Sequence, residues 1–303
     1  MKKGILSAAT AYLLWGFFPI YFKLVHAASP LEILSHRVVW SLIFLVGVLA
    51  FARDWSWLRP ALHDRRTMLI YLAASVLLGL NWFIYIWAVN NDFIVEASLG
   101  YFINPLVSVL LGVALLRERL RPTQWIPVGI ATIGVAYLSV LYGHLPWIAI
   151  ALALTFGLYG LLKKISPLRP KYGLSLETSF LFLPALGYLL ILEVQGQAVF
   201  GRQDWQISIL LALAGVITAL PLLLFTSGAQ AIPLYLMGML QYTAPTLQFL
   251  IGVYLYKEPF TIYQLLGFTL IWLSLLVFTL ESTLSRRRPA TSTSPPEKST
   301  APR

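Results

Sequence analysis

Long apolar segments separated by short polar ones run along almost the whole chain of 303 residues. Each segment holds about 17 to 23 residues, which is long enough for a helix to cross a hydrocarbon core of roughly 30 Å. Backbone groups in lipid must be hydrogen-bonded internally, and segments this long achieve that as helices rather than as barrel strands. The pattern therefore predicts an all-α membrane protein with ten transmembrane helices, at residues 4–22, 33–52, 67–89, 94–116, 123–141, 146–162, 174–194, 206–228, 234–256 and 261–281.

The later part of this pattern repeats the earlier part at an offset of 140 residues. Pro105 interrupts one apolar segment and Pro245 another, and a glutamate follows each proline thirteen residues later, at Glu118 and Glu258. At the same offset five further positions carry identical residues in both halves: Leu110, Gly112, Val113, Leu115 and Gln124. Proline-broken segments at matched places in two halves are typical of secondary transporters, and they indicate where the binding site lies.

Each half of the repeat holds five predicted helices, which is an odd number. Two such halves in series must therefore lie in opposite orientations across the membrane, as inverted repeats. We expect two five-helix repeats at residues 1–142 and 143–284. The remaining residues 285–303 are rich in Pro, Ser and Thr, and we expect a disordered tail there because they cannot bury enough apolar surface.

Composition supports a membrane protein and gives no sign of an enzyme. Hydrophobic residues make up 58% of the chain and charged residues 11%, and the mean hydropathy is +0.77. The chain has no cysteine, which excludes disulfides and Fe–S clusters. It contains no Walker loop, no Gly-x-Ser-x-Gly elbow and no His-Glu-x-x-His motif. We therefore predict no catalytic residues, no metal ion and no cofactor.

The formal net charge of +10 is explained by topology rather than by nucleic acid. If the N-terminus is cytoplasmic and the helices alternate, nearly all Lys and Arg residues lie on the cytoplasmic side. The exceptions are Lys23, Arg37, Arg202 and Lys257. This positive-inside bias predicts that both termini are cytoplasmic and that the basic segments contact anionic lipid. The first apolar segment resembles a signal peptide, but we expect it to be retained.

Polar residues follow one face of the predicted helix 94–116, beside its proline. Pro105 cannot donate to the carbonyl of Tyr101, and Pro245 cannot donate to that of Gln241. Tyr101 and Asn104 share a face by their spacing, and the second repeat has Gln241 and Tyr242 beside its own proline. The functional interpretation is that these four residues line a substrate cavity. The alternative is hydrogen bonding between helices with close packing of small residues.

Ionisable residues within apolar segments are further candidates. Arg37 lies about one turn inside its helix, and it either binds an anionic group on a solute, pairs with Glu32 or Glu96, or extends to the interface. His36 is a candidate for proton coupling because its ordinary pKa is near 6.5. The alternative for His36 is a hydrogen-bonded packing role. Glu96 is a second proton-coupling candidate, although an acid near a helix N-terminus also suits the helix dipole.

Two further groups complete the candidates. Asn81 and Trp82 are predicted to line the cavity from the helix at 67–89, although tryptophans in such segments are more often packing residues. Glu118 and Glu258 close their helices beside Arg117 and Lys257, and we interpret them as ion pairs at the helix ends.

These residues give the chain a family resemblance. It resembles the EamA family of the drug/metabolite transporter superfamily, and most closely its RarD branch. The resemblance covers roughly residues 4–282 and rests on these motifs: Ala11-Tyr12, Trp15-Gly16, Pro19-x-Tyr21-Phe22-Lys23, Glu32-Ile33-Leu34-x-His36-Arg37, Trp40-Ser41, Asn81-Trp82, Trp87-Ala88-Val89-Asn90-Asn91, the run from Glu96 to Leu106, Gln241-Tyr242 and Pro245-Thr246. It implies a permease of the bacterial inner membrane with a central cavity. Lys257 departs from the glycine that family members often carry there.

We therefore expect a secondary transporter that moves a small organic solute or drug-like metabolite by alternating access, with proton coupling as one mechanism. Homo-oligomerisation stays open. A membrane-embedded enzyme is one alternative, but His26, His36, His63 and His144 fall on both sides of the membrane and cannot form one metal site. A non-transporting sensor is the other alternative. A sensor would bind the solute without moving it, and would usually carry a soluble module.

Overall fold

The computed structural model describes residues 1–90, 94–141, 147–202, 204–257 and 261–287. The predicted tail at 285–303 lies almost entirely outside these residues. The first half of the chain forms α1 (Lys2–Gly16), α2 (Phe18–Leu24), α3 (Pro30–Phe51), α4 (Leu58–His63), α5 (Arg65–Asn90), α6 (Ile94–Ala114), the 3-10 turn η1 (Pro122–Gln124) and α7 (Trp125–Leu141). The second half forms α8 (Trp147–Ile165), α9 (Pro170–Val194), α10 (Trp205–Ala231), α11 (Leu234–Gln241), α12 (Thr243–Leu250), the π-helical turn η2 (Ile251–Leu255) and α13 (Ile262–Arg287).

Helix occupies each of the ten apolar ranges predicted from the sequence, so the all-helical class is confirmed. By length and composition, seven of the helical segments in the described residues could cross a membrane. Shorter apolar stretches lie at Gly100–Ala114 and Leu265–Phe278. The predicted helix at 234–256 is divided into α11, α12 and η2, which is why no single long span is found there.

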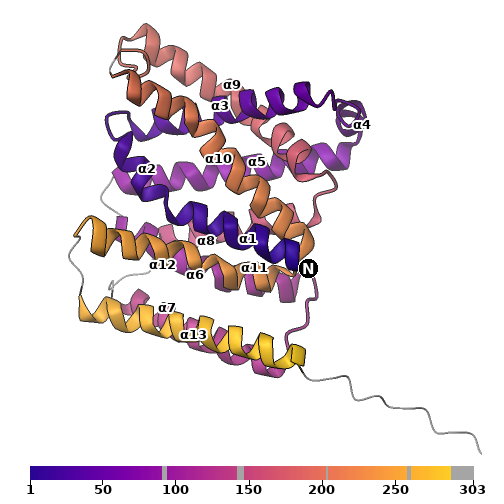
Figure 1. Ribbon diagram of the computed structural model, residues 1–303, viewed down its shortest axis with the longest axis vertical. Helices are drawn as coiled ribbons and strands as arrows, with labels where there is room; N and C mark the ends of the chain where they lie inside the picture. The colour runs from indigo at the N-terminus through magenta and orange to yellow at the C-terminus, as the bar shows by residue number, and fades with distance from the viewer. Residues whose placement is uncertain (91–93, 142–146, 203, 258–260, 288–303) are drawn as a thin grey trace, which may run out of the picture.

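Helices from the early and late parts of the chain pack in pairs (Figure 1). α1 packs on α10 and α12, α3 on α9 and α10, α6 on α8 and α11, and α5 on α8 and α9. α7 and α13 lie side by side at one end of the long axis (Figure 1). The N-terminus, α4 and the last turn of α13 lie on the same side of the molecule, at the right in Figure 1. The centre of the bundle is therefore built by both halves.

The proline positions differ from one another in their effect on the helices. α6 continues through Pro105, whereas the second half is interrupted at Tyr242, between α11 and α12, three residues before Pro245. The sequence predicted matched breaks at the two prolines, and of these the structure has only the interruption near Pro245. An unpredicted break separates α1 from α2 at Phe17. There Gln248 Nε2 donates to the carbonyl of Trp15 at 3.0 Å. A side chain of the second half thus satisfies a carbonyl to which Pro19, having no N–H, cannot donate.

A close backbone approach fixes α3 against α10. A Cβ added to Gly215 would lie 2.3 Å from the carbonyl carbon of Trp40, so only glycine fits there. The next residue of α3, Ser41, donates to the carbonyl of Gly215 at 3.1 Å. This contact places Thr218, one turn further along α10, beside Arg37 of α3. The register of the two helices thus sets the surroundings of an intramembrane charge.

Candidate functional site

A cavity of about 360 Å³ lies in the centre of the bundle, and both halves of the chain line it. Its size suits a small organic ligand. The lining residues are mostly aromatic side chains and amides: Tyr12, Trp15, Phe18, Pro19, Phe22, Lys23, Arg37, Leu78, Asn81, Trp82, Tyr85, Tyr101, Asn104, Phe156, Leu222, Gln241, Ala244, Pro245 and Gln248. Six of the candidate side chains named from the sequence are therefore brought together at one site, namely Arg37, Asn81, Trp82, Tyr101, Asn104 and Gln241, and Pro245 lines it with them.

A second cavity of about 310 Å³ continues from the first toward the connection between α2 and α3. The two share the side chains of Phe22, Arg37, Trp82 and Tyr85. The second one extends to His26, Ala28 and Pro30, which lie at or next to that connection. The space therefore runs from the middle of the bundle toward one end of the molecule.

Arg37 stands between the two cavities. Its Nε donates to Thr218 Oγ1 at 2.9 Å, and its guanidinium carbon lies 4.8 Å from the ring centre of Trp82. The rings of Phe18 and Phe22 are 5.6 Å and 5.7 Å away. None of the ion pairs among the described residues includes Arg37. Among the described residues its charge is thus held by aromatic faces and by the hydroxyl of Thr218, and none of them brings a carboxylate to the outer nitrogens of the guanidinium.

The sequence suggested two acidic partners for Arg37. The structure places one of them, Glu32, in another role: it is 1% exposed, and its Oε1 accepts from the backbone N–H groups of Val199 at 2.8 Å and Phe200 at 3.4 Å. The pairing with Glu32 is therefore not formed, because that carboxylate already accepts backbone hydrogen bonds from the turn before α10. The side chain of Glu96 lies outside the described residues, so the second pairing stays a prediction.

The amides of the cavity are deeply placed. Asn81 Nδ2 donates to the carbonyl of Leu152 at 3.0 Å and to Thr155 Oγ1 at 2.9 Å, which joins α5 to α8. Asn104 is 2% exposed, and its Oδ1 has no hydrogen-bond partner among the described residues. A buried polar atom without a partner is uncommon in native proteins. Asn104 is therefore a candidate for contact with a bound solute, while Asn81 also has a structural role.

Among the described candidates, Tyr242 and His36 are not residues that line the cavities. Tyr242, at the break between α11 and α12, is completely buried in an apolar cluster with Phe102 and Met239. His36 accepts from Trp40 Nε1 at 3.2 Å and packs against Phe200, with 4.8 Å between the ring centres. The structure thus places Tyr242 in the packing and His36 in the contact between α3 and the segment before α10.

Beyond the cavity, the same helices pack tightly at the end that holds the N-terminus. On α8, Phe156 lines the cavity, and one turn later Tyr159 is fully buried and stacks on Phe225 at 5.9 Å between ring centres. On α1, Tyr12 lines the cavity, whereas Ala8 is in close contact with Gly228 of α10. The cavity is therefore bounded by packed side chains at this end, which we name the packed end: Ala8, Ala74, Tyr159, Phe225, Ala229 and Leu234.

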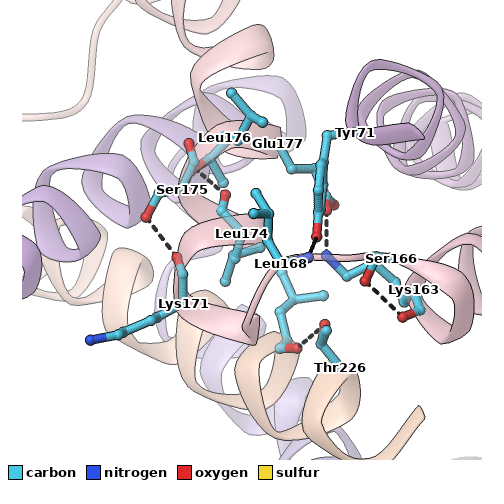
Figure 2. Close-up of polar contacts among 12 residues, drawn as sticks. Tyr71, Lys163, Ser166, Leu168, Lys171, Leu174, Ser175, Leu176, Glu177 and Thr226 are labelled. Carbon is cyan, nitrogen blue, oxygen red and sulfur yellow. Dashed lines mark hydrogen bonds and ion pairs between the residues drawn. The ribbon is translucent and has the colours of Figure 1, made fainter. Parts of the chain in front are cut away.

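A buried ion pair lies at the packed end (Figure 2). Lys163 Nζ of α8 is 2.6 Å from Glu177 Oε2 of α9, and both side chains are fully buried. The ammonium group also lies 5.4 Å from the ring centre of Tyr71 and 5.6 Å from that of Tyr159. The sequence indicated neither partner as a pair. Lys163 was assigned to the cytoplasmic charge excess, and no local pattern links it to a glutamate in the next helix.

Glu118 joins the two halves at the same end. Its carboxylate accepts from the backbone N–H groups of Leu234 at 2.7 Å and Tyr235 at 3.1 Å, which are the first two residues of α11. This corrects the expected ion pair with Arg117, since the acid caps the N-terminus of another helix instead. Its repeat counterpart Glu258 lies outside the described residues.

Comparisons with known proteins agree with this architecture. Two stretches of the chain, residues 2–140 and 146–280, match the EamA-like transporter family. The chain is 47% identical over 291 residues to the uncharacterized transporter YojE of Bacillus subtilis (strain 168), covering 94% of this chain and 96% of that protein. It is 44% identical over 288 residues to the protein RarD of Streptomyces exfoliatus, covering 95% and 91%. A crystal structure with 20% sequence identity has the same fold, with a TM-score of 0.70 over 94% of this chain and 99% of that one.

Proposed function

The chain belongs to the EamA-like transporter family, and on this premise we propose that it is a secondary transporter for a small organic solute or drug-like metabolite. Members of the family are transporters and not enzymes. The observation that supports this function best is a single cavity lined by both halves of a duplicated chain. A site shared by two repeats is the arrangement that alternating access requires.

We further propose ten transmembrane helices in two inverted repeats, with both termini in the cytoplasm of a bacterial cell. The distribution of Lys and Arg supports this orientation. The placement of the N-terminus and the end of α13 on one side of the molecule is consistent with it (Figure 1). In this orientation the packed end faces the cytoplasm, and the second cavity leads toward the outside. The conformation described would then be outward-facing.

Transport would require the packed end to open while the outer cavity closes. The contacts at the packed end mostly join helices from different halves, such as α1 with α10 and α6 with α11. Rocking of one half against the other would therefore separate them. Proton coupling through His36 or Glu96 belongs to the same proposal, and an imposed pH gradient that leaves solute uptake unchanged would remove it.

Accessibility of single thiols tests alternating access without knowledge of the solute. The chain has no cysteine, so each introduced cysteine is the sole thiol. Phe18→Cys lines the cavity and should react with a membrane-impermeant maleimide added outside intact cells. Ala74→Cys, buried at the packed end, should react from the cytoplasmic side of inverted vesicles, because the packed end opens during the transport cycle.

Gly47→Cys is the matched control, since a side chain at that position of α3 meets no protein atom within 4 Å. It should stay unreactive from both sides, as expected for a thiol in lipid. If Ala74→Cys is as unreactive as Gly47→Cys in inverted vesicles, the packed end does not open and alternating access is wrong for this chain.

A further inference from the structure

The cavity has an electrostatic character that the proposed transport function does not by itself require. Resting on that function, we propose that the solute is an organic anion, with a carboxylate group on an aromatic or similarly apolar body. The inference rests on the kinds of charge that line the cavity, on the contacts of Arg37 and on the aromatic walls around it. Each of these can be tested separately from transport itself.

Among the described residues, the charges that line the two cavities have one sign. Arg37 and Lys23 line them, and the described lining residues include no aspartate or glutamate. Glu32 is the nearest acid along α3, and its carboxylate accepts backbone hydrogen bonds from the turn before α10. Apolar walls focus the field of such charges into the space between them. The cavity should therefore attract anions and repel cations.

The contacts of Arg37 leave it prepared to bind a carboxylate. A charged side chain within a membrane usually faces the interior of the bundle or a water-filled cavity, where it pairs with an opposite charge or a backbone carbonyl. Here Nε is fixed by Thr218 and one face of the guanidinium is directed at Trp82, so the group is oriented before a ligand arrives. The planar guanidinium matches two carboxylate oxygens with parallel hydrogen bonds. No acid among the described residues pairs with Arg37, so its carboxylate partner is one that a solute would supply.

The rest of the lining indicates the body of the solute. Trp15, Phe18, Phe22, Tyr85 and Tyr101 present aromatic surface to the cavity. Such surface favours a flat apolar group by stacking and burial. The Oδ1 of Asn104, which has no partner among the described residues, would accept from an N–H or O–H group of the solute. The chemistry that fits is a small aromatic carboxylate that also carries one hydrogen-bond donor.

Three solutes with the same ring and different charges test the inference. At about pH 6, N-acetylphenylalaninate is an anion, N-acetylphenylalaninamide is neutral, and phenylalaninamide is a cation. Binding of each to the purified full-length protein is measured by the shift of its thermal unfolding with solute concentration. We expect the anion to bind at least about tenfold more tightly than the neutral amide, because hydrogen bonds between charged groups contribute at least that much to affinity. The cation should bind most weakly.

Variants assign the preference to Arg37. Arg37→Gln should lower the affinity for the anion to that for the neutral amide. Arg37→Lys should keep part of the preference for the anion, because it keeps the positive charge. Arg202→Gln is the matched control, because Arg202 is an exposed arginine that pairs with Glu193 at 2.6 Å outside the cavity. It should bind all three solutes like the unmodified protein. Asn104→Ala should weaken both N-acetyl solutes equally.

The outcomes separate this inference from the transport proposal. If the neutral amide binds as tightly as the anion, if none of the three binds at millimolar concentration, or if Arg37→Gln keeps the preference, the anion inference is wrong. Flux of the same solutes in proteoliposomes then tests transport. An anion that binds through Arg37 but does not cross the membrane would refute transport of that solute and leave the anion site standing. Equal flux of the anion and the neutral amide would refute the preference for anions and leave the transport proposal standing.

Discussion

Two helices that begin alike carry opposite charges with opposite surroundings. α3 starts at Pro30 and α9 at Pro170, which is the same offset of 140 that relates Pro105 to Pro245. Seven residues after the first proline is Arg37, and seven residues after the second is Glu177. Arg37 lines the cavity and forms no ion pair with a described residue, whereas Glu177 is fully buried against Lys163.

This difference shows how one repeated helix serves two purposes. A charge that is taken fully out of water is tolerated only when a partner neutralises it, so Glu177 and Lys163 together hold α8 to α9 at the packed end. A charge that keeps contact with an open cavity needs no such partner and can bind a solute instead. The two matched positions thus differ in their surroundings: Glu177 belongs to a buried ion pair, and Arg37 lines the cavity.

The largest expected effect comes from breaking the buried pair. Glu177→Gln should destabilise the protein by about 3–5 kcal/mol, because Lys163 is left as a buried charge without a partner. Lys163→Met should have a similar cost for the opposite reason. The double variant Lys163→Met/Glu177→Leu should recover most of the loss, since neither charge remains. The measurement is the free energy of unfolding, or the midpoint of thermal unfolding, of the purified protein in detergent.

Arg37→Gln is the contrasting variant. It removes one hydrogen bond to Thr218 and the contacts with aromatic rings, so its stability should fall by only about 1 kcal/mol. Equal losses for Arg37→Gln and Glu177→Gln would mean that Arg37 is a structural charge too, and the contrast between the two helices would disappear.

An effect smaller than that of Glu177→Gln is expected at the close contact between α3 and α10, which holds Thr218 beside Arg37. Gly215→Ala would bring a Cβ to 2.3 Å from the backbone of Trp40, and the backbone cannot move aside as a side chain would. α3 and α10 must then separate, which costs about 1–3 kcal/mol and displaces Thr218 from Arg37. We expect lower stability in thermal unfolding and weaker binding of N-acetylphenylalaninate.

Gly47→Ala is the control on the same helix, where a Cβ meets no atom within 4 Å. It should gain about 0.5–1 kcal/mol from helix propensity. If Gly215→Ala behaves like Gly47→Ala, the close approach of α3 to α10 does not set the geometry of Arg37.

The helices could be predicted from sequence because a membrane imposes a simple requirement on the chain. Every apolar range long enough to cross the hydrocarbon core became helical, since each residue has its hydrogen-bond partner four residues away. The same periodicity placed Tyr101 and Asn104 on one face, and both line the cavity. Local spacing was sufficient wherever the helix is continuous.

The remaining details depend on contacts between distant segments. Tyr242 lies at the break between α11 and α12 and is buried in an apolar cluster, whereas its neighbour Gln241 lines the cavity. Lys163, near the end of α8, meets Glu177 of the next helix, α9, and Glu118 caps a helix more than one hundred residues later. Pro105 predicted a break, but α6 continues through it. A single chain contains no local signal for such contacts.

The smallest expected effect comes from a surface counterpart of the buried pair, formed by Lys171 and Asp54. Asp54 Oδ2 lies 2.6 Å from Lys171 Nζ and 2.5 Å from the hydroxyl of Tyr172, whose ring stacks on Trp57. The hydrogen bond from Lys171, and next that from Tyr172, lower the pKa of Asp54 below its ordinary value of 3.8. The side chains of the pair are 33% and 25% exposed, against 0% for Lys163 and Glu177, so water weakens the attraction.

A lowered pKa means that the stabilisation is complete above the ordinary pKa and is lost as the pH falls through the lowered pKa. Asp54→Asn should therefore cost far less than Glu177→Gln at neutral pH, and nothing once Asp54 is protonated. Unfolding midpoints of Asp54→Asn and the unmodified protein, measured from neutral pH to below pH 3.8, should converge. A constant difference, or one as large as that of Glu177→Gln, would show that burial does not determine the worth of these pairs.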